Sequence, residues 1–133
     1  MTAETSTLPH LKKVLMVDDD AGNILIMAQA LGDRYDLRFA TSGAEALDLV
    51  TEDMPDLILL DMVMPEMDGL QVLMTLRKDE KKRRIPVLFV TAYNDATSQT
   101  KAMEAGAAEM IFKPFDPQSL RQKVALHLSK SQA

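Results

Sequence analysis

An unbroken apolar run, Leu57–Leu60, ends directly at the acid Asp61. A short run without polar alternation is typical of a strand that is buried on both faces of a sheet. Pro65 prevents the strand from simply continuing, and Asp68-Gly69 indicates a turn before a helix. The sequence therefore predicts a carboxylate at the carboxyl end of a buried strand, which is the edge where open α/β sheets bind their ligands.

Strand patterns and helix patterns alternate along the rest of the chain. Apolar runs or alternation indicate strands, and apolar residues spaced by three and four indicate helices. Strands are expected at 13–17, 36–40, 57–61, 86–91 and 109–112, and helices at 22–31, 43–51, 69–78, 95–105 and 117–128. In the helix at 69–78, the residues expected in one helical register are Leu70, Leu73, Met74 and Arg77. This alternation predicts an α/β fold, a doubly wound five-stranded parallel sheet with five helices.

The composition fits one globular domain. A chain of 133 residues with 47% hydrophobic residues can bury a substantial core. We expect a flexible N-terminal arm over residues 1–11, one domain over 12–129 and a tail over 130–133. Because cysteine is absent, disulfides and thiolate sites are excluded. No apolar run has transmembrane length and no signal peptide is evident, so we expect a cytoplasmic protein.

Charged and hydroxyl groups follow the carboxyl ends of four predicted strands. Asp18 and Asp19 follow the first strand and Asp61 the third, while Thr91-Ala92 ends the fourth and Lys113 follows the fifth. If the first strand is central, these groups converge at the topological switch point of the sheet. Three carboxylates repel one another unless a cation lies among them, and oxygen ligands alone suit Mg²⁺.

This set of side chains fits phosphoryl transfer to a carboxylate nucleophile. Lys113 supplies a fixed positive charge, and the Thr91 hydroxyl and Ala92 backbone N–H would complete a shell for phosphoryl oxygens. Taken singly, the acids 18–20 could be a helix N-cap cluster and Asp61 a turn residue. Their occurrence together with Thr91 and Lys113 favours a functional site.

Four motifs resemble the receiver domain of two-component response regulators in their order and spacing. They are VLMVDDD, LILLDMVMPEMDG, PVLFVTA and AGAAEMIFKPF, and the resemblance covers roughly residues 12–129. It implies a flavodoxin-like fold with the strand order 2-1-3-4-5 that the chemotaxis receiver has. It also implies a domain that takes a phosphoryl group from a histidine kinase or a histidine phosphotransfer protein and then changes a protein-binding surface.

The resemblance implies Asp61 as the phospho-acceptor and Mg²⁺ as the cofactor. Asp19 would bind the metal directly, and Asp18 would act mainly through water. Asp61 itself and the backbone carbonyl of Val63 would be further ligands.

The same resemblance implies which groups respond to the phosphoryl group. Thr91 would form a hydrogen bond to it and shift toward it, and the backbone of Ala92 would bind one of its oxygens. Lys113 would form the ion pair that reports the new charge. The Lys113–Pro114 bond is commonly cis in this family, which would aim the lysine into the crevice.

Three positions depart from the pattern of many receivers. The residue three before the lysine is often aromatic, and here it is Met110. Methionine can fill a pocket in several rotamers, so any switch would not use an aromatic flip. Val63 and Tyr93 lack the polar groups that help to orient an attacking water in fast-hydrolysing relatives, so we expect a longer phosphoryl lifetime than in the chemotaxis receiver.

The expected partners are proteins. In the family the phosphoryl donor docks on the first helix and on the loop after the fifth strand, where Asn23, Ile26 and Phe115 would lie. A net charge of −5 argues against direct nucleic-acid binding, and no membrane contact is expected. We expect a monomer or a phosphorylation-dependent dimer, either a stand-alone receiver or part of a larger regulator. It would catalyse only its own phosphorylation and dephosphorylation.

Other protein classes fit the sequence less well. A Mg²⁺-dependent phosphohydrolase with an aspartyl nucleophile is the main alternative, but such enzymes typically use D-x-D, and Asp61-Met62-Val63 lacks the second acid. A flavin- or nucleotide-binding module needs a Gly-rich or hydroxyl-rich phosphate loop after the first strand, whereas this chain has the acidic segment DDDAGN there. A degenerate receiver would lack site residues, and every expected one is present.

Overall fold

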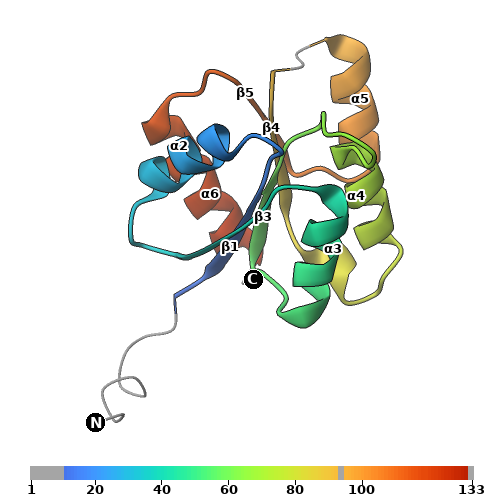
Figure 1. Cartoon of the computed structure of the whole chain (residues 1–133), viewed down its shortest axis with the longest axis horizontal. Coiled ribbons are helices and arrows are strands. Elements are labelled where there is room, and N and C mark those ends of the chain that lie inside the picture. The colour runs from blue at the N-terminus through green and yellow to red at the C-terminus, as the bar shows by residue number, and fades with distance from the viewer. Residues whose placement is uncertain (1–10, 93–94, 132–133) are drawn as a thin grey trace, which may run out of the picture.

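The computed structural model describes residues 11–92 and 95–131 (Figure 1). Within this part of the chain, five parallel strands form one sheet in the order β2-β1-β3-β4-β5. The strands are β1 (Lys13–Val17), β2 (Asp36–Ala40), β3 (Leu57–Leu60), β4 (Val87–Thr91) and β5 (Glu109–Phe112). The helices are α2 (Ala21–Leu31), α3 (Gly43–Glu52), α4 (Gly69–Arg77), α5 (Ala96–Glu104) and α6 (Pro117–Ser131), with a 3₁₀ turn, η1 (Lys82–Arg84), before β4. The predicted fold and the strand order are confirmed.

The sheet lies between two layers of helices, α2 and α6 on one face and α3, α4 and α5 on the other (Figure 1). Side chains alternate between the faces: Val14 and Met16 pack with α2 and α6, and Leu15 and Val17 pack with α3 and α4. All residues of β3 are buried. Two covered faces explain why the central strands are continuously apolar, since no side chain there meets water.

Side-chain caps fix where the helices begin. At α4, Asp68 accepts a hydrogen bond from the Gln71 amide at 2.8 Å, and the Gln71 side chain accepts one from the Asp68 amide at 2.9 Å. At α3, Ser42 caps the Glu45 amide at 3.1 Å, but the Glu45 carboxylate accepts from the amide of Thr41. Each cap satisfies amides that a helix leaves without partners in its first turn.

The predicted register of α4 was wrong. Leu73 is buried, but Met74 is 49% exposed and Arg77 lies at the edge of the core. The residues of this helix that face the core are Gly69, Val72, Leu73 and Leu76. The predicted set and the observed set both have the spacing of one helical face. The observed set begins with Gly69, which has no side chain and can therefore lie against the core.

The C-terminal boundary also differs from the prediction. Helix α6 continues to Ser131, so residues 130 and 131 are helical and do not belong to a tail. Residues 1–10, which make up nearly all of the expected arm, and residues 132–133 lie outside the described residues. Among the helices in the described ranges, none is long and apolar enough to cross a lipid bilayer.

Candidate functional site

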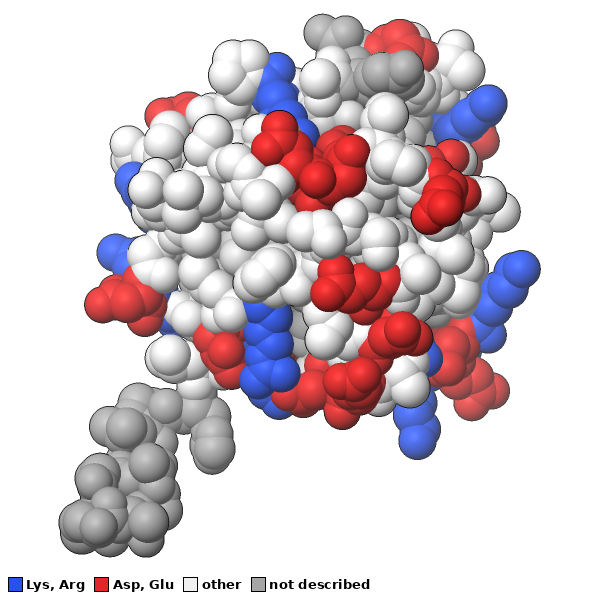
Figure 2. Space-filling model, in the orientation of Figure 1, with Lys and Arg blue, Asp and Glu red and all other residues white. Residues whose placement is uncertain are grey.

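The carboxyl ends of β1 and β3 bring Asp18, Asp19 and Asp61 together. One carboxylate oxygen of each lies within 4.8 Å of the others. Asp18 is only 1% exposed and Asp61 7% exposed, whereas Asp19 is open to solvent. Figure 2, which has the orientation of Figure 1, shows acidic side chains gathered at the place where β1 ends. The convergence that the sequence predicted for these acids is therefore present.

The backbone of the sheet fixes two of these acids. The Asp61 amide donates to the Val17 carbonyl at 2.9 Å, and the Asp18 amide donates to the Ala40 carbonyl at 3.1 Å. The Asp20 amide donates to the Asp18 carboxylate at 2.9 Å, while the Asp20 side chain caps the start of α2. Asp18 and Asp61 thus leave the sheet at neighbouring strand ends, and Asp20 serves the helix.

Lys113 reaches into the crevice from the end of β5. Its Nζ lies 2.7 Å from Oδ2 of Asp18 and 3.3 Å from Oδ2 of Asp61. Its amide donates to the Thr91 carbonyl at 2.9 Å, and the Lys113–Pro114 bond is cis, as expected. Burial lowers the pKa of Lys113, but the hydrogen bond to Asp18 and the charge of Asp61 together raise this pKa above its ordinary value.

The electrostatics of the crevice favour a bound cation. Burial raises the pKa of Asp61, and the charge of Asp18 raises it further, against the opposing effects of Lys113 and the Val63 amide. When all are ionised, three carboxylates and one ammonium group leave two negative charges without compensation. Oxygen donors with this excess charge fit a hard divalent cation such as Mg²⁺.

The end of β4 lies at the same edge of the sheet. Phe89 of β4 pairs with Leu60 of β3, the residue directly before Asp61. Thr91 lies two residues after Phe89 and is therefore near the same edge as Asp61. Thr91 is fully buried and Ala92 is exposed. Tyr93, for which the sequence predicts a part in phosphoryl lifetime, lies outside the described residues.

A mostly apolar groove opens beside the lysine, between α2 and the segment that follows β5. Asn23 and Ile26 line one side, and Lys113, Pro114 and Phe115 line the other, with Ala92 at the end of β4. Ile26 is 52% exposed, and Phe115 is partly buried against the core. The three residues for which the sequence predicted a docking role therefore line one groove.

Gly69 is a site residue whose importance could not be predicted from the sequence, because the pair Asp68-Gly69 indicates only a turn before a helix. Its amide donates to the Met62 carbonyl at 2.9 Å. A methyl group built on it would lie 2.2 Å from the backbone oxygen of Asp61 and 2.9 Å from the Phe89 ring. Helix α4 therefore begins directly against the backbone of Asp61, and only glycine allows this approach. The sequence signal is the Asp68-Gly69 pair, but a turn explains that pair equally well.

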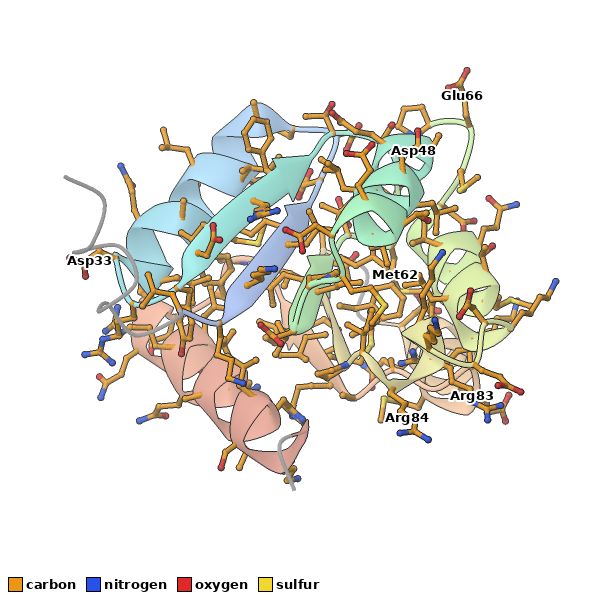
Figure 3. All side chains as sticks on the ribbon, turned by 90° about the horizontal axis from the view of Figure 1, so that it is seen from below. Asp33, Asp48, Met62, Glu66, Arg83 and Arg84 are labelled. Atoms are coloured by element: carbon orange, nitrogen blue, oxygen red, sulfur yellow. The ribbon has the colours of Figure 1, made fainter. Side chains whose placement is uncertain are left out.

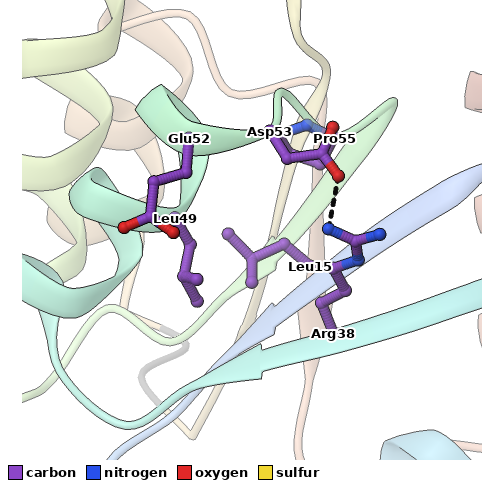
Figure 4. A pocket seen from close by; sticks show the side chains of 6 residues that line it. All are labelled: Leu15, Arg38, Leu49, Glu52, Asp53 and Pro55. Carbon is purple, nitrogen blue, oxygen red and sulfur yellow. Dashed lines mark hydrogen bonds and ion pairs between the residues drawn. The ribbon is translucent and has the colours of Figure 1, made fainter.

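Two polar clusters lie away from the crevice. At the amino end of β1, Asp53 accepts a hydrogen bond from Lys13 at 2.6 Å. It accepts a second one from Arg38, beside a small pocket (Figure 4). Between β5 and α6, buried His127 lies 2.9 Å from Glu109. Both clusters link secondary-structure elements, and neither shares a residue with the crevice.

Comparisons with known proteins agree on one family. The sequence model of the family "Response regulator receiver domain" matches residues 14–125. The solved CheY-like receiver domain protein of Methanospirillum hungatei JF-1 is 28% identical, with a TM-score of 0.85 over 92% of this chain and 97% of that chain. A putative response regulator of Chloroflexus aurantiacus J-10-fl is 33% identical, with a TM-score of 0.85 over 92% and 99% of the two chains.

The curated relatives are longer proteins. Response regulator PleD of Caulobacter vibrioides is 36% identical over 113 residues, which are 84% of this chain but 25% of PleD. The chain spans about a quarter to about a half of the length of the curated relatives that it matches. The similarity therefore concerns one domain of those proteins.

Proposed function

The chain belongs to the response regulator receiver domain family, and from this premise we propose that Asp61 is the residue that accepts the phosphoryl group. The observation that carries the proposal is the position of Asp61. It is a buried carboxylate at the end of β3, with oxygens of two further acids within 4.8 Å and the Lys113 ammonium at 3.3 Å. We also propose that this domain acts as a signalling receiver and catalyses only its own phosphorylation and dephosphorylation.

In the proposed reaction the donor is a phosphohistidine of a histidine kinase or a histidine phosphotransfer protein. A carboxylate oxygen of Asp61 attacks the phosphorus, a P–O bond forms and the P–N bond to the donor imidazole breaks. The electron pair of that bond stays on the imidazole nitrogen. The Lys113 ammonium then pairs with the charge that Asp61 has gained, and the Thr91 hydroxyl and the Ala92 N–H bind phosphoryl oxygens.

Asp18, Asp19, Asp61 and the Val63 carbonyl would hold Mg²⁺. The ion would supply positive charge to the phosphoryl oxygens and balance the two excess negative charges of the crevice. Asp18 is already hydrogen-bonded to Lys113 and to the Asp20 amide, which supports a role for it through water. Exposed Asp19 supports direct ligation.

We propose that the signal leaves the site through β4 and β5. The hydrogen bond from the Lys113 amide to the Thr91 carbonyl joins the two strands at the crevice. Met110 pairs with Phe89 and is partly buried against the core, at the position where many receivers have an aromatic residue. A change at Thr91 would then reach the surface of α5, β5 and α6 through a flexible side chain.

The groove beside Lys113 is the proposed docking site for the donor, because an apolar groove at the mouth of the crevice suits an amphipathic helix. Ile26→Asp should slow transfer from a phosphorylated donor protein and leave phosphorylation by acetyl phosphate unchanged. Leu25→Asp is the matched control, since Leu25 is exposed on the same helix outside the groove. Equal transfer rates for the two variants would remove the docking proposal.

The phosphohydrolase alternative is not favoured, because the comparisons with known proteins identify a receiver. The sequence supports the same choice. The position two residues after the nucleophile, where such enzymes carry their second acid, is occupied by Val63, whose side chain has no group for acid–base catalysis.

The test is intact mass spectrometry after incubation with MgCl₂ and acetyl phosphate. We expect one added phosphoryl group on the wild-type protein, no addition without Mg²⁺, and none on Asp61→Ala. Asp48→Ala, which removes an exposed acid on α3, is the matched control and should be phosphorylated normally. Phosphorylation that persists in Asp61→Ala, or wild-type protein that stays unmodified by acetyl phosphate and by phosphorylated donor proteins alike, would overturn the proposal.

A further inference from the structure

The loop between β3 and α4, residues 61–68, contains a strained turn. The Met67 amide donates to the Pro65 carbonyl at 2.7 Å, and between them Glu66 has a φ of 69°. Residues other than glycine seldom adopt this left-handed conformation, because it costs of order 1 kcal/mol or more. The conformation therefore needs support from contacts elsewhere in the loop.

The Glu66 side chain does not give this support. It points away from the body of the molecule at the tip of the loop (Figure 3). Within residues 11–92 and 95–131, its carboxylate has no hydrogen-bond or ion-pair partner. The restraint on the turn must come from a neighbouring residue.

Met67 supplies it by packing over the first residue of α3. A methyl group built on Gly43 would lie 2.9 Å from Cγ of Met67 and 3.0 Å from its Cβ. Gly43 is buried, and Met67 packs against the core cluster that lies under α3 and α4. Cγ2 of Val72, on α4, would also lie 2.9 Å from this methyl group, so Met67 and Val72 together occupy the space that any side chain at position 43 would need.

Gly43, on which Met67 packs, is connected through the backbone to the residue that holds Asp18. The Asp18 amide donates to the Ala40 carbonyl, and the chain runs from Ala40 through the Ser42 cap directly into Gly43. Contact between Met67 and Gly43 therefore joins the two sides of the crevice. One side carries Asp18, and the other carries the loop with Val63.

We propose that Met67, which packs on Gly43, is a positioning residue that holds the loop 61–68 in the conformation from which the Val63 carbonyl would bind Mg²⁺. The inference rests on the proposed function, because it concerns the same Mg²⁺ site. Met67 touches neither the metal nor the phosphoryl group. Its effect arises from the conformation of the backbone between Asp61 and Asp68.

Mg²⁺ binding to the unphosphorylated full chain tests the proposal. We would titrate MgCl₂ and follow the amide resonances of Asp19 and Val63 by NMR. Met67→Ala should raise the dissociation constant about tenfold, as loss of an outer-shell support does at other metal sites. Met67→Leu, which keeps the bulk of the side chain, should restore most of the affinity. Met74→Ala is the matched control on the exposed face of α4 and should bind like the wild type.

A second readout needs no metal. The Gly69 amide donates to the Met62 carbonyl and closes the base of the loop, so Met67→Ala should speed hydrogen exchange at this amide and Met74→Ala should not. If wild-type protein binds Mg²⁺ and Met67→Ala binds it equally well, only the positioning role falls. If wild-type protein itself shows no response to Mg²⁺, the proposed metal site is wrong and the inference falls with it.

Discussion

The Lys113 ammonium lies 2.7 Å from Oδ2 of Asp18, a carboxylate that is almost completely buried. Its distance to Asp61 is longer, 3.3 Å. The lysine is therefore held mainly by an acid that is not the proposed acceptor. This arrangement lets the charge on Asp61 change while Lys113 keeps one fixed partner in the crevice.

Removing the lysine should be costly. Lys113→Ala leaves Asp18 and Asp61 close together without a counter-charge, and breaking a buried ion pair by removing one partner costs roughly 3–5 kcal/mol. We expect a loss at the lower end of this range in metal-free buffer, measured by urea denaturation, with partial recovery on addition of MgCl₂. Lys101→Ala is the control, since Lys101 is exposed on α5. Equal stability of the two variants would contradict the assigned role of Lys113.

Neutralising Asp61 should have the opposite effect. Burial, and then the charge of Asp18, raise the pKa of Asp61. An acid with a raised pKa in the folded state destabilises the fold as pH rises from its ordinary pKa through the raised value. In metal-free buffer at neutral pH, Asp61→Asn should therefore be more stable than the wild type, and the difference should shrink in acid. Urea denaturation at several pH values measures this, and a wild-type protein that is the more stable at neutral pH would refute it.

The sequence predicted the strands from local patterns, and it predicted that the acids 18, 19 and 61 converge because the carboxyl ends of parallel strands lie at one edge of the sheet. The apolar strands, the acids 18, 19 and 61 and the position of Lys113 could all be identified from the residues, while the strand order came from the resemblance to receivers. Contacts between distant segments could not be identified this way. The register of α4 depends on the close approach of Gly69 to Asp61, which no spacing rule contains.

The same limit applies to the loop after β3. That Met67 packs on Gly43 follows from how α3 and α4 lie beside each other, and the methionines of this loop look alike in the sequence. His127 is a further case, because its partner Glu109 is on another element. Side-chain pairing across elements is decided by tertiary packing, so a local pattern cannot reveal it.

Gly69→Ala should destabilise the fold and disturb the site. The added methyl group would lie 2.2 Å from the Asp61 backbone oxygen, and overpacking of this kind typically costs about 1–3 kcal/mol. We expect a loss at or above the upper end of this range in urea denaturation, with slower phosphorylation by acetyl phosphate. Gly22→Ala is the matched control. Its methyl group would meet only the end of the Asp20 side chain, at 3.1 Å, so we expect little change.

The cluster at the amino end of β1 should make stability depend on pH (Figure 4). The hydrogen bond from Lys13 lowers the pKa of Asp53, burial opposes this, and Arg38 lowers the pKa further. An acid with a depressed pKa stabilises the fold above its ordinary pKa, and this stabilisation is lost as pH falls through the depressed value. Asp53→Asn should thus be less stable than the wild type at neutral pH, with a difference that shrinks as pH falls below about 4 and through the depressed pKa. Lys13→Met should show the same trend, and a difference independent of pH would contradict the pairing.

The phosphoryl group on Asp61 should be long-lived. Hydrolysis needs a water molecule aligned with the phosphorus, and a polar side chain beside the acceptor can hold it there. Val63, whose amide donates to the Asp61 carboxylate, is 48% exposed, so water has access to this position, but the hydrocarbon side chain of Val63 offers it no hydrogen-bonding group. We expect spontaneous loss over minutes or longer, followed by mass spectrometry after removal of acetyl phosphate. Val63→Gln should accelerate the loss and Val63→Ala should not, because only glutamine adds a group that can orient water. Loss within seconds from the wild type would show that another group already aligns the water.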